Sequence, residues 1–227
     1  MICAIIPTYN ASGSLGGILA QLSGQVDRIV VSDCESADDT ITCAIEYGAI
    51  ITVGTKGRGQ QLALGADWVN GADWLLFLHA DNKLPPNWRK SIETHIRRHP
   101  KSAGYFRYRA DASGLWPRIM DFGVAMRCRW WRLPYGDQGL LIPREIYEAV
   151  GGYPKQSLFE DVAIIDAITE RIGRGNLRPL KGHMRVDISR YAEKGIWTKG
   201  WENLALLKAY RRGEDVETLA QKYNETI

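Results

Sequence analysis

The first hundred residues alternate between short apolar runs and segments with the helical spacing of apolar residues. The apolar runs cover 2–7, 27–33, 49–53 and 72–78. Strands joined by helical segments of this length are typical of β–α–β units, which predict a parallel sheet flanked by helices. Because such crossovers are right-handed, the four runs should end at the same edge of the sheet. The pattern therefore predicts an α/β fold.

The second half of the chain is less regular. Its pattern predicts helices over 87–99, 115–127, 160–172 and 196–212, and strands over 103–109, 139–142 and 184–188. The helices of the first half are expected over 15–22, 36–47 and 59–69. Ser36 is expected to cap the second of these, with Asp39 in the capping-box position. Pro143 is expected to begin a further helix.

Composition excludes several classes of protein. A formal net charge of +3 is too small to indicate a nucleic-acid partner. The four cysteines have neither zinc-site nor disulfide spacing, which favours a reducing cytoplasm. No apolar run reaches the roughly 20 residues of a membrane span, and the chain enters a strand-like run at once, so no signal peptide is expected.

Polar residues follow the apolar runs. Asp33 ends the second run, and Asp81 follows the fourth. Ligands of open α/β sheets bind at the carboxyl ends of strands, where Asp81 could hold magnesium or manganese on a diphosphate. The alternative for Asp81 is a turn before Asn82. Asp33 could accept a hydrogen bond from a nucleobase, or instead cap the following helix.

Two further helix starts carry charged residues. The segment 57–61, Gly-Arg-Gly-Gln-Gln, opens a helix where backbone N–H groups favour anions, and Arg58 could add a forked contact. Its spacing is neither a P-loop nor a dinucleotide fingerprint. Glu160 and Asp161 begin another helix, where Asp161 could serve as a general base. The alternative is that both acids only complement the helix dipole.

The segment 127–139 combines arginine, tryptophan and a polar turn. Arg129, Trp131 and their neighbours could stack on a ring and grip phosphate. Alternatively the tryptophans pack inward and the arginines are solvated. In the turn that follows, Asp137 and Gln138 could hydrogen-bond sugar hydroxyls.

Taken together, these motifs resemble the family-two glycosyltransferases with the GT-A fold, most strongly over 1–82 and 133–172. The matching motifs are Pro7-Thr8-Tyr9-Asn10, Asp33 with Ser36, Gly57-Arg58 with Gln61, Gly65 and Ala66, His79-Ala80-Asp81, and Glu160-Asp161. Leu-Phe-Leu-His-Ala-Asp at 76–81 and Leu-Pro-Tyr-Gly-Asp-Gln-Gly at 133–139 resemble a small single-domain group sometimes labelled arsenosugar-biosynthesis glycosyltransferases.

The resemblance implies a role for each matching residue in the inverting transfer of a sugar from a nucleoside diphosphate, UDP favoured, to an acceptor hydroxyl. Asp161 would be the catalytic base, and Asp81, with His79, would hold Mn²⁺ or Mg²⁺. The nucleotide-sugar site would comprise Pro7, Thr8, Tyr9, Asn10, Asp33, Arg58, Gln61, Ala80 and Asp81. The acceptor site would comprise Trp131, Gly136, Asp137, Gln138 and Glu160.

The resemblance also implies a single GT-A domain over 1–227. Residues 1–100 would bind the nucleotide and residues 101–190 the acceptor, with C-terminal helices over 191–227. Trp197, Trp201, Leu204 and Leu207 of these helices could meet the inner face of a membrane. The alternative is that they pack on the sheet.

The sequence departs from the family pattern at two places. His79 replaces an acid, and an imidazole ligand would favour manganese over magnesium. Cys34 and Glu35 replace a glycine-rich turn. A non-catalytic protein that binds a nucleotide sugar is one rival interpretation, favoured by His79. A sugar nucleotidyltransferase is another, disfavoured because 8–11 lacks a glycine-rich loop with arginine and lysine.

Overall fold

A seven-stranded sheet forms the centre of the protein. The computed structural model describes the backbone of residues 1–188 and 196–225 and the side chains of residues 1–188 and 202–223. The strands are β1 (Ile2–Thr8), β2 (Arg28–Asp33), β3 (Ile50–Val53), β4 (Trp74–Phe77), β5 (Ala103–Ala110), β6 (Leu140–Pro143) and β7 (Leu177–Val186). Their order is β3-β2-β1-β4-β6-β5-β7, and β6 alone runs antiparallel to its neighbours. The predicted, mostly parallel α/β sheet is confirmed.

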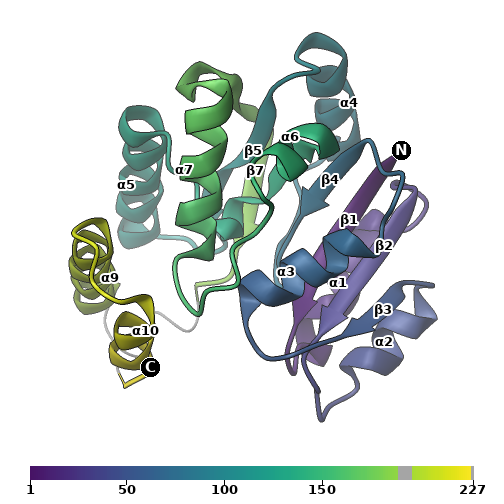
Figure 1. Cartoon of the computed structure of the whole chain (residues 1–227), viewed down its shortest axis with the longest axis horizontal. Coiled ribbons are helices and arrows are strands. Elements are labelled where there is room, and N and C mark those ends of the chain that lie inside the picture. Colours follow the sequence, from purple (N-terminus) through teal and green to yellow (C-terminus); the bar gives the residue numbers. More distant parts are fainter. Residues whose placement is uncertain (189–195, 226–227) are drawn as a thin grey trace.

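Helices cover both faces of this sheet (Figure 1). One face carries α1 (Ser12–Leu22), α2 (Thr40–Glu46) and α4 (Trp88–Arg98). The other carries α3 (Arg58–Asp67), α5 (Leu115–Trp131), α6 (Arg144–Ala149) and α7 (Glu160–Ile172). Two short turns, η1 (Gly136–Gln138) and η2 (Arg174–Asn176), precede β6 and β7, and α9 (Ile196–Arg211) and α10 (Val216–Glu225) end the described chain.

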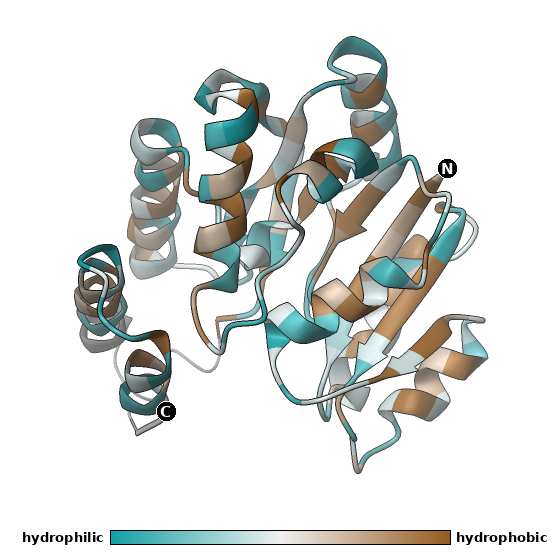
Figure 2. Ribbon diagram, viewed as in Figure 1, coloured by the Kyte–Doolittle hydropathy of each residue, from teal (hydrophilic) through white to brown (hydrophobic). Residues whose placement is uncertain are grey.

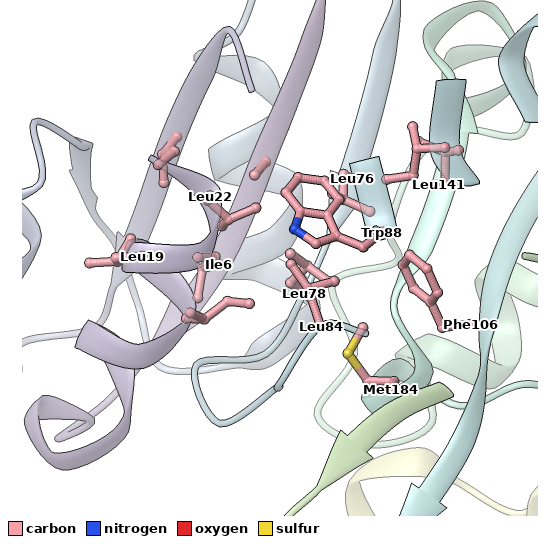
Figure 3. Close-up of a cluster of buried hydrophobic side chains, with 14 of the residues drawn as sticks. Ile6, Leu19, Leu22, Leu76, Leu78, Leu84, Trp88, Phe106, Leu141 and Met184 are labelled. Carbon is pink, nitrogen blue, oxygen red and sulfur yellow. The ribbon is translucent and has the colours of Figure 1, made fainter. Parts of the chain in front are cut away.

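Alternation along the strands divides the core into two layers. In β1, Ile6 points toward α1 and α4, whereas Ile5 points toward α3. Successive strand side chains face opposite sides of a sheet, so a sheet covered on both faces needs near-continuous apolar strands. Figure 2 shows these strands as predominantly hydrophobic. Figure 3 shows Ile6, Leu76 and Phe106 meeting Trp88 in the first layer.

Two glycines let α3 approach its neighbours closely. A Cβ on Gly65 would lie 2.5 Å from Cγ2 of Ile5, so the helix rests directly on β1. A Cβ on Gly59 would lie 2.2 Å from the carbonyl oxygen of Pro154. Since no side chain fits at either position, Gly59 sets the start of α3 against the segment before α7, and Gly65 sets its last turn against the sheet.

Three elements differ from the sequence-based predictions. The last strand begins at Leu177 rather than at residue 184. The start was missed because proline, here Pro179, is uncommon inside strands. Proline is tolerated in β7 because β7 is an edge strand. The helix expected from Ser36 begins at Thr40, because the Ser36 hydroxyl bonds Asp33 instead of capping it. Helix α10 lies within residues 191–227, where C-terminal helices were expected, but its own bounds were not predicted.

Several described apolar side chains of the C-terminal helices pack against the rest of the protein, whereas Leu204 is 41% exposed. Leu207 and Tyr210 of α9 contact the second core layer, and Leu219 of α10 packs with Leu158. The Arg211 guanidinium pairs with Asp166 of α7, with Nη2 3.0 Å from Oδ1. The side chains of Trp197 and Trp201 lie outside the described residues. What is described of α9 thus gives no support to the predicted membrane contact.

Within residues 1–188 and 196–225, no helix combines the length and the apolarity that a membrane crossing requires.

Candidate functional site

A cavity of about 410 Å³ opens where β1 and β4 end. We call it the strand-end cavity. It is lined by Pro7, Thr8, Tyr9, Asn10, Ala11, Gly13, Ser14, Arg58, Gln61, His79, Ala80 and Asp81. Eight of the nine residues predicted to bind the nucleotide sugar are among them, Asp33 being the exception. Residues 11, 13 and 14 were not anticipated, although a helix that begins directly after a strand end is a recognised anion-binding arrangement.

Asp33 lies behind the cavity wall and holds two loops together. It is fully buried, and its Oδ2 accepts hydrogen bonds from Thr8 Oγ1 at 2.7 Å and from Ser36 Oγ at 2.6 Å. The N–H of Asn10 donates in turn to Ser36 Oγ at 2.8 Å. The carboxylate that was expected to contact the nucleobase therefore joins the ends of β1 and β2 instead.

The loop after β2 shows how the chain replaces the usual glycine-rich turn. Glu35 adopts the left-handed conformation with φ 59°, and Asn10, in the facing loop, does so with φ 48°. Asparagine tolerates this region, whereas glutamate enters it rarely. Asn10 also accepts a hydrogen bond from the N–H of Ala37 at 2.8 Å, so the two loops constrain each other.

Gln61 fixes the floor of the cavity. Its side chain is 5% exposed, and its Nε2 donates to the carbonyl oxygens of Thr8 and Ser32, each at 2.7 Å. Those carbonyls belong to neighbouring strands at the point where ladder pairing stops. The amide therefore supplies a donor to two carbonyls at the strand ends, of which that of Thr8 also accepts a hydrogen bond from the N–H of Cys34 at 3.3 Å.

Arg58 and Glu160 form an ion pair across the site. Arg58 Nε donates to Glu160 Oε1, and the glutamate is 1% exposed while the arginine side chain remains 44% exposed. Burial acts to lower the pKa of Arg58, but the charges of Glu160 and Asp161 and the hydrogen bond to Glu160 together outweigh it and raise that pKa. Glu160, predicted to meet the acceptor, is turned toward Arg58 instead and offers almost no surface to a ligand.

The segment after β4 places one carboxylate in the open. Asp81 is exposed at the cavity, whereas Asn82 is buried and accepts a hydrogen bond from the N–H of His79 at 2.7 Å. Asn82 Nδ2 donates to the carbonyl oxygen of Asp137 at 3.0 Å, which ties this segment to η1. Burial, assisted by the charge of Arg58, lowers the pKa of His79 to about 3, so its imidazole is neutral.

His79 packs tightly on the η1 loop. A Cβ on Gly136 would lie only 2.7 Å from His79 Nε2. The N–H of Gly136 donates to Asp161 Oδ2 at 3.0 Å, and the N–H of Val162 donates to Asp161 Oδ1 at 2.8 Å. Asp161 is thus held in a fixed orientation at the start of α7, beside the residues that follow β4.

Asp137 adds a second acid to this region. Burial, together with the nearby charge of Asp161, raises the pKa of Asp137 to about 6. Its Oδ1 is buried and has no hydrogen-bond partner among the described residues. A buried acceptor without a partner favours a ligand that supplies a hydroxyl or a cation.

The polar groups of the strand-end cavity fit a metal ion that shares its ligands with the substrate. No group of three or more His, Cys, Asp or Glu side chains in the described part of the chain is arranged to hold a metal alone. Mg²⁺ usually takes one or two protein carboxylates plus phosphate oxygens and water. The exposed Asp81, with His79 beside it and the unpartnered oxygen of Asp137 nearby, matches that limited requirement.

Two residues predicted to contact the acceptor have other positions. Gln138 is 1% exposed; its Nε2 donates to the carbonyl of Phe106 at 3.0 Å, and its Oε1 accepts from Arg127 Nη2 at 3.2 Å. It therefore secures the η1 loop from within. Trp131 is 63% exposed, does not line the strand-end cavity and contacts Trp130 edge-on at 6.2 Å between ring centroids. The alternative of inward-packed tryptophans is also wrong, because Trp130 is equally exposed.

Comparison with known sequences agrees with this geometry. The family model described as "Glycosyl transferase family 2" matches residues 3–154. An uncharacterized glycosyltransferase of Rickettsia felis is 29% identical over 99 residues, which are 40% of this chain and 32% of that protein. One from Rickettsia conorii is 29% identical over 99 residues, 33% of its length. The match with each curated relative thus spans about a third of that relative.

Solved structures share the fold at low identity. Glucosyl-3-phosphoglycerate synthase from Mycobacterium tuberculosis, in complex with Mn²⁺, UDP and glucosyl-3-phosphoglycerate, superposes with a TM-score of 0.57 at 17% identity, over 83% of this chain and 70% of that one. S. aureus TarS 1-349, in complex with UDP, superposes with a TM-score of 0.61 at 15% identity, over 83% of this chain and 60% of that one. Mannosyl-3-phosphoglycerate synthase from Rubrobacter xylanophilus superposes with a TM-score of 0.56 at 19% identity, over 83% of this chain and 65% of that one.

The mostly parallel sheet with its cavity at the strand ends is the GT-A fold of these neighbours. Since the family model covers well over half of the 227 residues, this chain belongs to glycosyl transferase family 2.

Proposed function

We propose that the protein transfers a sugar from a nucleoside diphosphate, with UDP favoured, to an acceptor hydroxyl, with inversion at the anomeric carbon. The observation that carries this proposal is the gathering of residues from β1, α3 and the segment after β4 around one cavity. Its volume of about 410 Å³ lies in the range of roughly 300–1,000 Å³ typical of small-molecule sites. Family membership and neighbours solved with UDP and Mn²⁺ support the same reaction.

The diphosphate would lie between Arg58 and Asp81. Arg58 is held by Glu160 and presents its guanidinium to the cavity, where a forked contact with phosphate oxygens is favourable. Asp81 would hold Mn²⁺ or Mg²⁺, and His79 would contribute through Nδ1, because its Nε2 lies against Gly136. When bound, the metal ion offsets the negative charge that develops on the departing diphosphate.

Asp161 would be the catalytic base. Both of its oxygens accept backbone N–H bonds, which fixes the carboxylate beside Gly136 and leaves lone pairs for a further hydrogen bond. It would take the proton of the acceptor hydroxyl as that oxygen attacks the anomeric carbon from the face opposite the diphosphate. This single displacement inverts the anomeric configuration. Asp137 Oδ1 would accept a hydrogen bond from a sugar hydroxyl.

Within one domain, the first half of the chain would bind the sugar donor and the second half the acceptor. Residues 1–100 supply every residue that lines the strand-end cavity, which supports a donor role for them. Residues 101–190 supply Asp137, Asp161 and the η1 loop, which supports an acceptor role. Residues 191–227 would buttress α7, as the contact of Arg211 with Asp166 indicates.

The substitution Asp161→Asn tests the base. We expect turnover, measured as UDP release, to fall by about 10²–10⁴-fold. The affinity for UDP and metal, measured by calorimetry, should stay within a factor of about two. Asp166→Asn on the same helix is the control, because Asp166 pairs with Arg211 and lies outside the site. Full turnover in the Asp161 variant would refute the assignment.

The same assay separates the rival functions. A wild-type protein that binds UDP-sugar with metal but never releases UDP, with any hydroxyl acceptor, would be a binding protein. Release of pyrophosphate from a nucleoside triphosphate and a sugar phosphate would identify a nucleotidyltransferase.

A further inference from the structure

A second cavity, of about 450 Å³, lies between β5, β7 and α5. We call it the arginine cavity. Its basic and acidic lining residues are Arg107, Arg109, Arg129, Arg132, His183 and Asp121. Arg107 and Arg109 stand near the carboxyl end of β5, which runs parallel to β1 and β4. Both cavities therefore belong to the same edge of the sheet.

The charges of the arginine cavity are unbalanced. Its one acid, Asp121, has Oδ2 3.7 Å from Arg109 Nε. No other arginine of the cavity forms an ion pair among the described side chains. Burial, with the charges of Arg107 and Arg109, lowers the pKa of His183, as expected in a region of positive potential. Like charges brought together repel, so such a cluster is stabilised by a bound anion.

Capping of α5 explains only part of this cluster. Arg129 lies in the last turn of that helix and Arg132 follows it, where cations favourably meet the helix dipole. Arg107 comes from a strand, so the dipole does not account for it. Arg132 is half-buried, and its charge acts to lower the pKa of the nearby Tyr105 hydroxyl, against the larger effect of burial, which raises it.

The η1 loop connects the arginine cavity with the proposed catalytic base, Asp161. Gln138 lines it, and Gly136, two positions earlier, donates its N–H to Asp161 Oδ2 at 3.0 Å. Two residues span at most about 7 Å of extended chain. An anionic group among the arginines would therefore leave the rest of a small molecule within reach of Asp161.

We propose that the arginine cavity binds a phosphate monoester carried by the acceptor. This inference rests on the proposed glycosyl transfer and names the class of its acceptor: a hydroxyl compound with a phosphate group. Guanidinium forks match phosphate oxygens, and three arginines without ion pairs suit a dianion better than a single carboxylate. The same group occurs in soluble phosphorylated metabolites and in lipid headgroups.

Binding of glycerol 3-phosphate to the full chain tests the proposal without requiring turnover. Saturating UDP and Mg²⁺ fill the strand-end cavity first, and glycerol serves as the uncharged comparison. We expect glycerol 3-phosphate to raise Tm and glycerol to leave it unchanged. Arg107→Gln and Arg132→Gln should each weaken binding about tenfold, because each removes a charge-assisted contact.

Arg118→Gln is the matched control, since Arg118 also lies on α5 but does not line the cavity. It should bind glycerol 3-phosphate like the wild type. The UDP affinity of every variant reports whether it is folded. Equal protection of the wild type and an Arg107→Gln/Arg132→Gln double variant, or no protection of either, would overturn the proposal.

The outcomes separate this inference from the proposed function. If UDP binds with metal and glycerol 3-phosphate does not bind, the acceptor class is wrong and the donor site stands. If glycerol 3-phosphate binds through the arginines and UDP does not bind, the donor assignment fails. Flotation with phosphatidic acid vesicles, lost in the double variant, would identify the lipid source, whereas glycerol 3-phosphate binding without flotation would identify the soluble one.

Discussion

The two cavities at the carboxyl edge of the sheet differ in how their charges are held. In the strand-end cavity, Arg58 already has a partner in Glu160, and Asp33, behind the cavity wall, has its partners in Thr8 and Ser36. In the arginine cavity, most guanidinium groups lack an acid among the described side chains. The charges of the first site are therefore paired before a ligand arrives, whereas most of those in the second are left to solvent or to the proposed anion.

Each cavity is nevertheless built around a buried glutamine. Gln61 joins the ends of β1 and β2, and Gln138 joins η1 to β5 and α5. An amide can donate and accept at once, so it connects backbone groups that regular pairing leaves open. Preorganisation is thus common to both sites, and the charge balance is what differs.

Among the substitutions that test this comparison, Asp81→Asn is expected to have the largest effect. Removing the exposed carboxylate should lower metal-dependent turnover by about 100-fold, equivalent to about 3 kcal/mol. Calorimetry of UDP with and without Mg²⁺ measures the accompanying loss of affinity. Asp39→Asn is the control, because Asp39 is exposed and makes no capping hydrogen bond. Metal dependence that survives in the Asp81 variant would remove Asp81 from the proposed site.

Gly59→Ala should distort the donor side alone. Its Cβ would lie 2.2 Å from the Pro154 oxygen, so we expect a loss of about 1–3 kcal/mol in the free energy of unfolding, measured in urea. UDP affinity should fall because Arg58 shifts, while glycerol 3-phosphate affinity is retained. Gly17→Ala, with no atom within 4 Å, should instead stabilise α1 by about 0.5–1 kcal/mol. Equal stability of the two variants would contradict this packing.

Replacing each glutamine by leucine tests whether the two sites are independent. Each change removes the side-chain donor to buried carbonyls, those of Thr8 and Ser32 or that of Phe106, and should cost about 1–3 kcal/mol of stability. Gln61→Leu should weaken UDP binding, and Gln138→Leu should weaken glycerol 3-phosphate binding. If either variant weakened both ligands equally, the division into donor and acceptor sides would be wrong.

The smallest effect is expected for Trp131→Ala. This side chain is 63% exposed and lines neither cavity, so stability should change by less than about 0.5 kcal/mol. Acceptor KM should equal that of the wild type. A severalfold rise in acceptor KM, with UDP affinity unchanged, would restore Trp131 to the acceptor site, as the sequence predicted.

The sequence predicted the strand ends well because the signals are local. Apolar runs and helical periodicity locate each β–α–β unit, and the handedness of the crossovers then places the strand ends together. Thr8 and Asp81 could be assigned to one edge for this reason. The irregular second half lacked that rule, so the start of β7 was missed and the bounds of α10 were not predicted.

Orientation was harder to predict than position. Asp33, Glu160 and Gln138 are of the right type and lie close to the site, but their polar atoms bond other parts of the protein. Arg58 and Glu160 are 102 positions apart, and no spacing rule connects them. A carboxylate near a cavity can face a ligand or an internal donor, and both choices have the same local sequence.

The amino-acid pattern alone determined the sheet, the edge at which it binds ligands and most of the residues gathered there, because strand and helix periodicity act over short distances. The tertiary structure alone decided which of those polar groups remain open, since that depends on partners that folding brings from far along the chain. It also brought arginines from β5 and from the end of α5 into one cavity, because their proximity results from packing a helix on a strand.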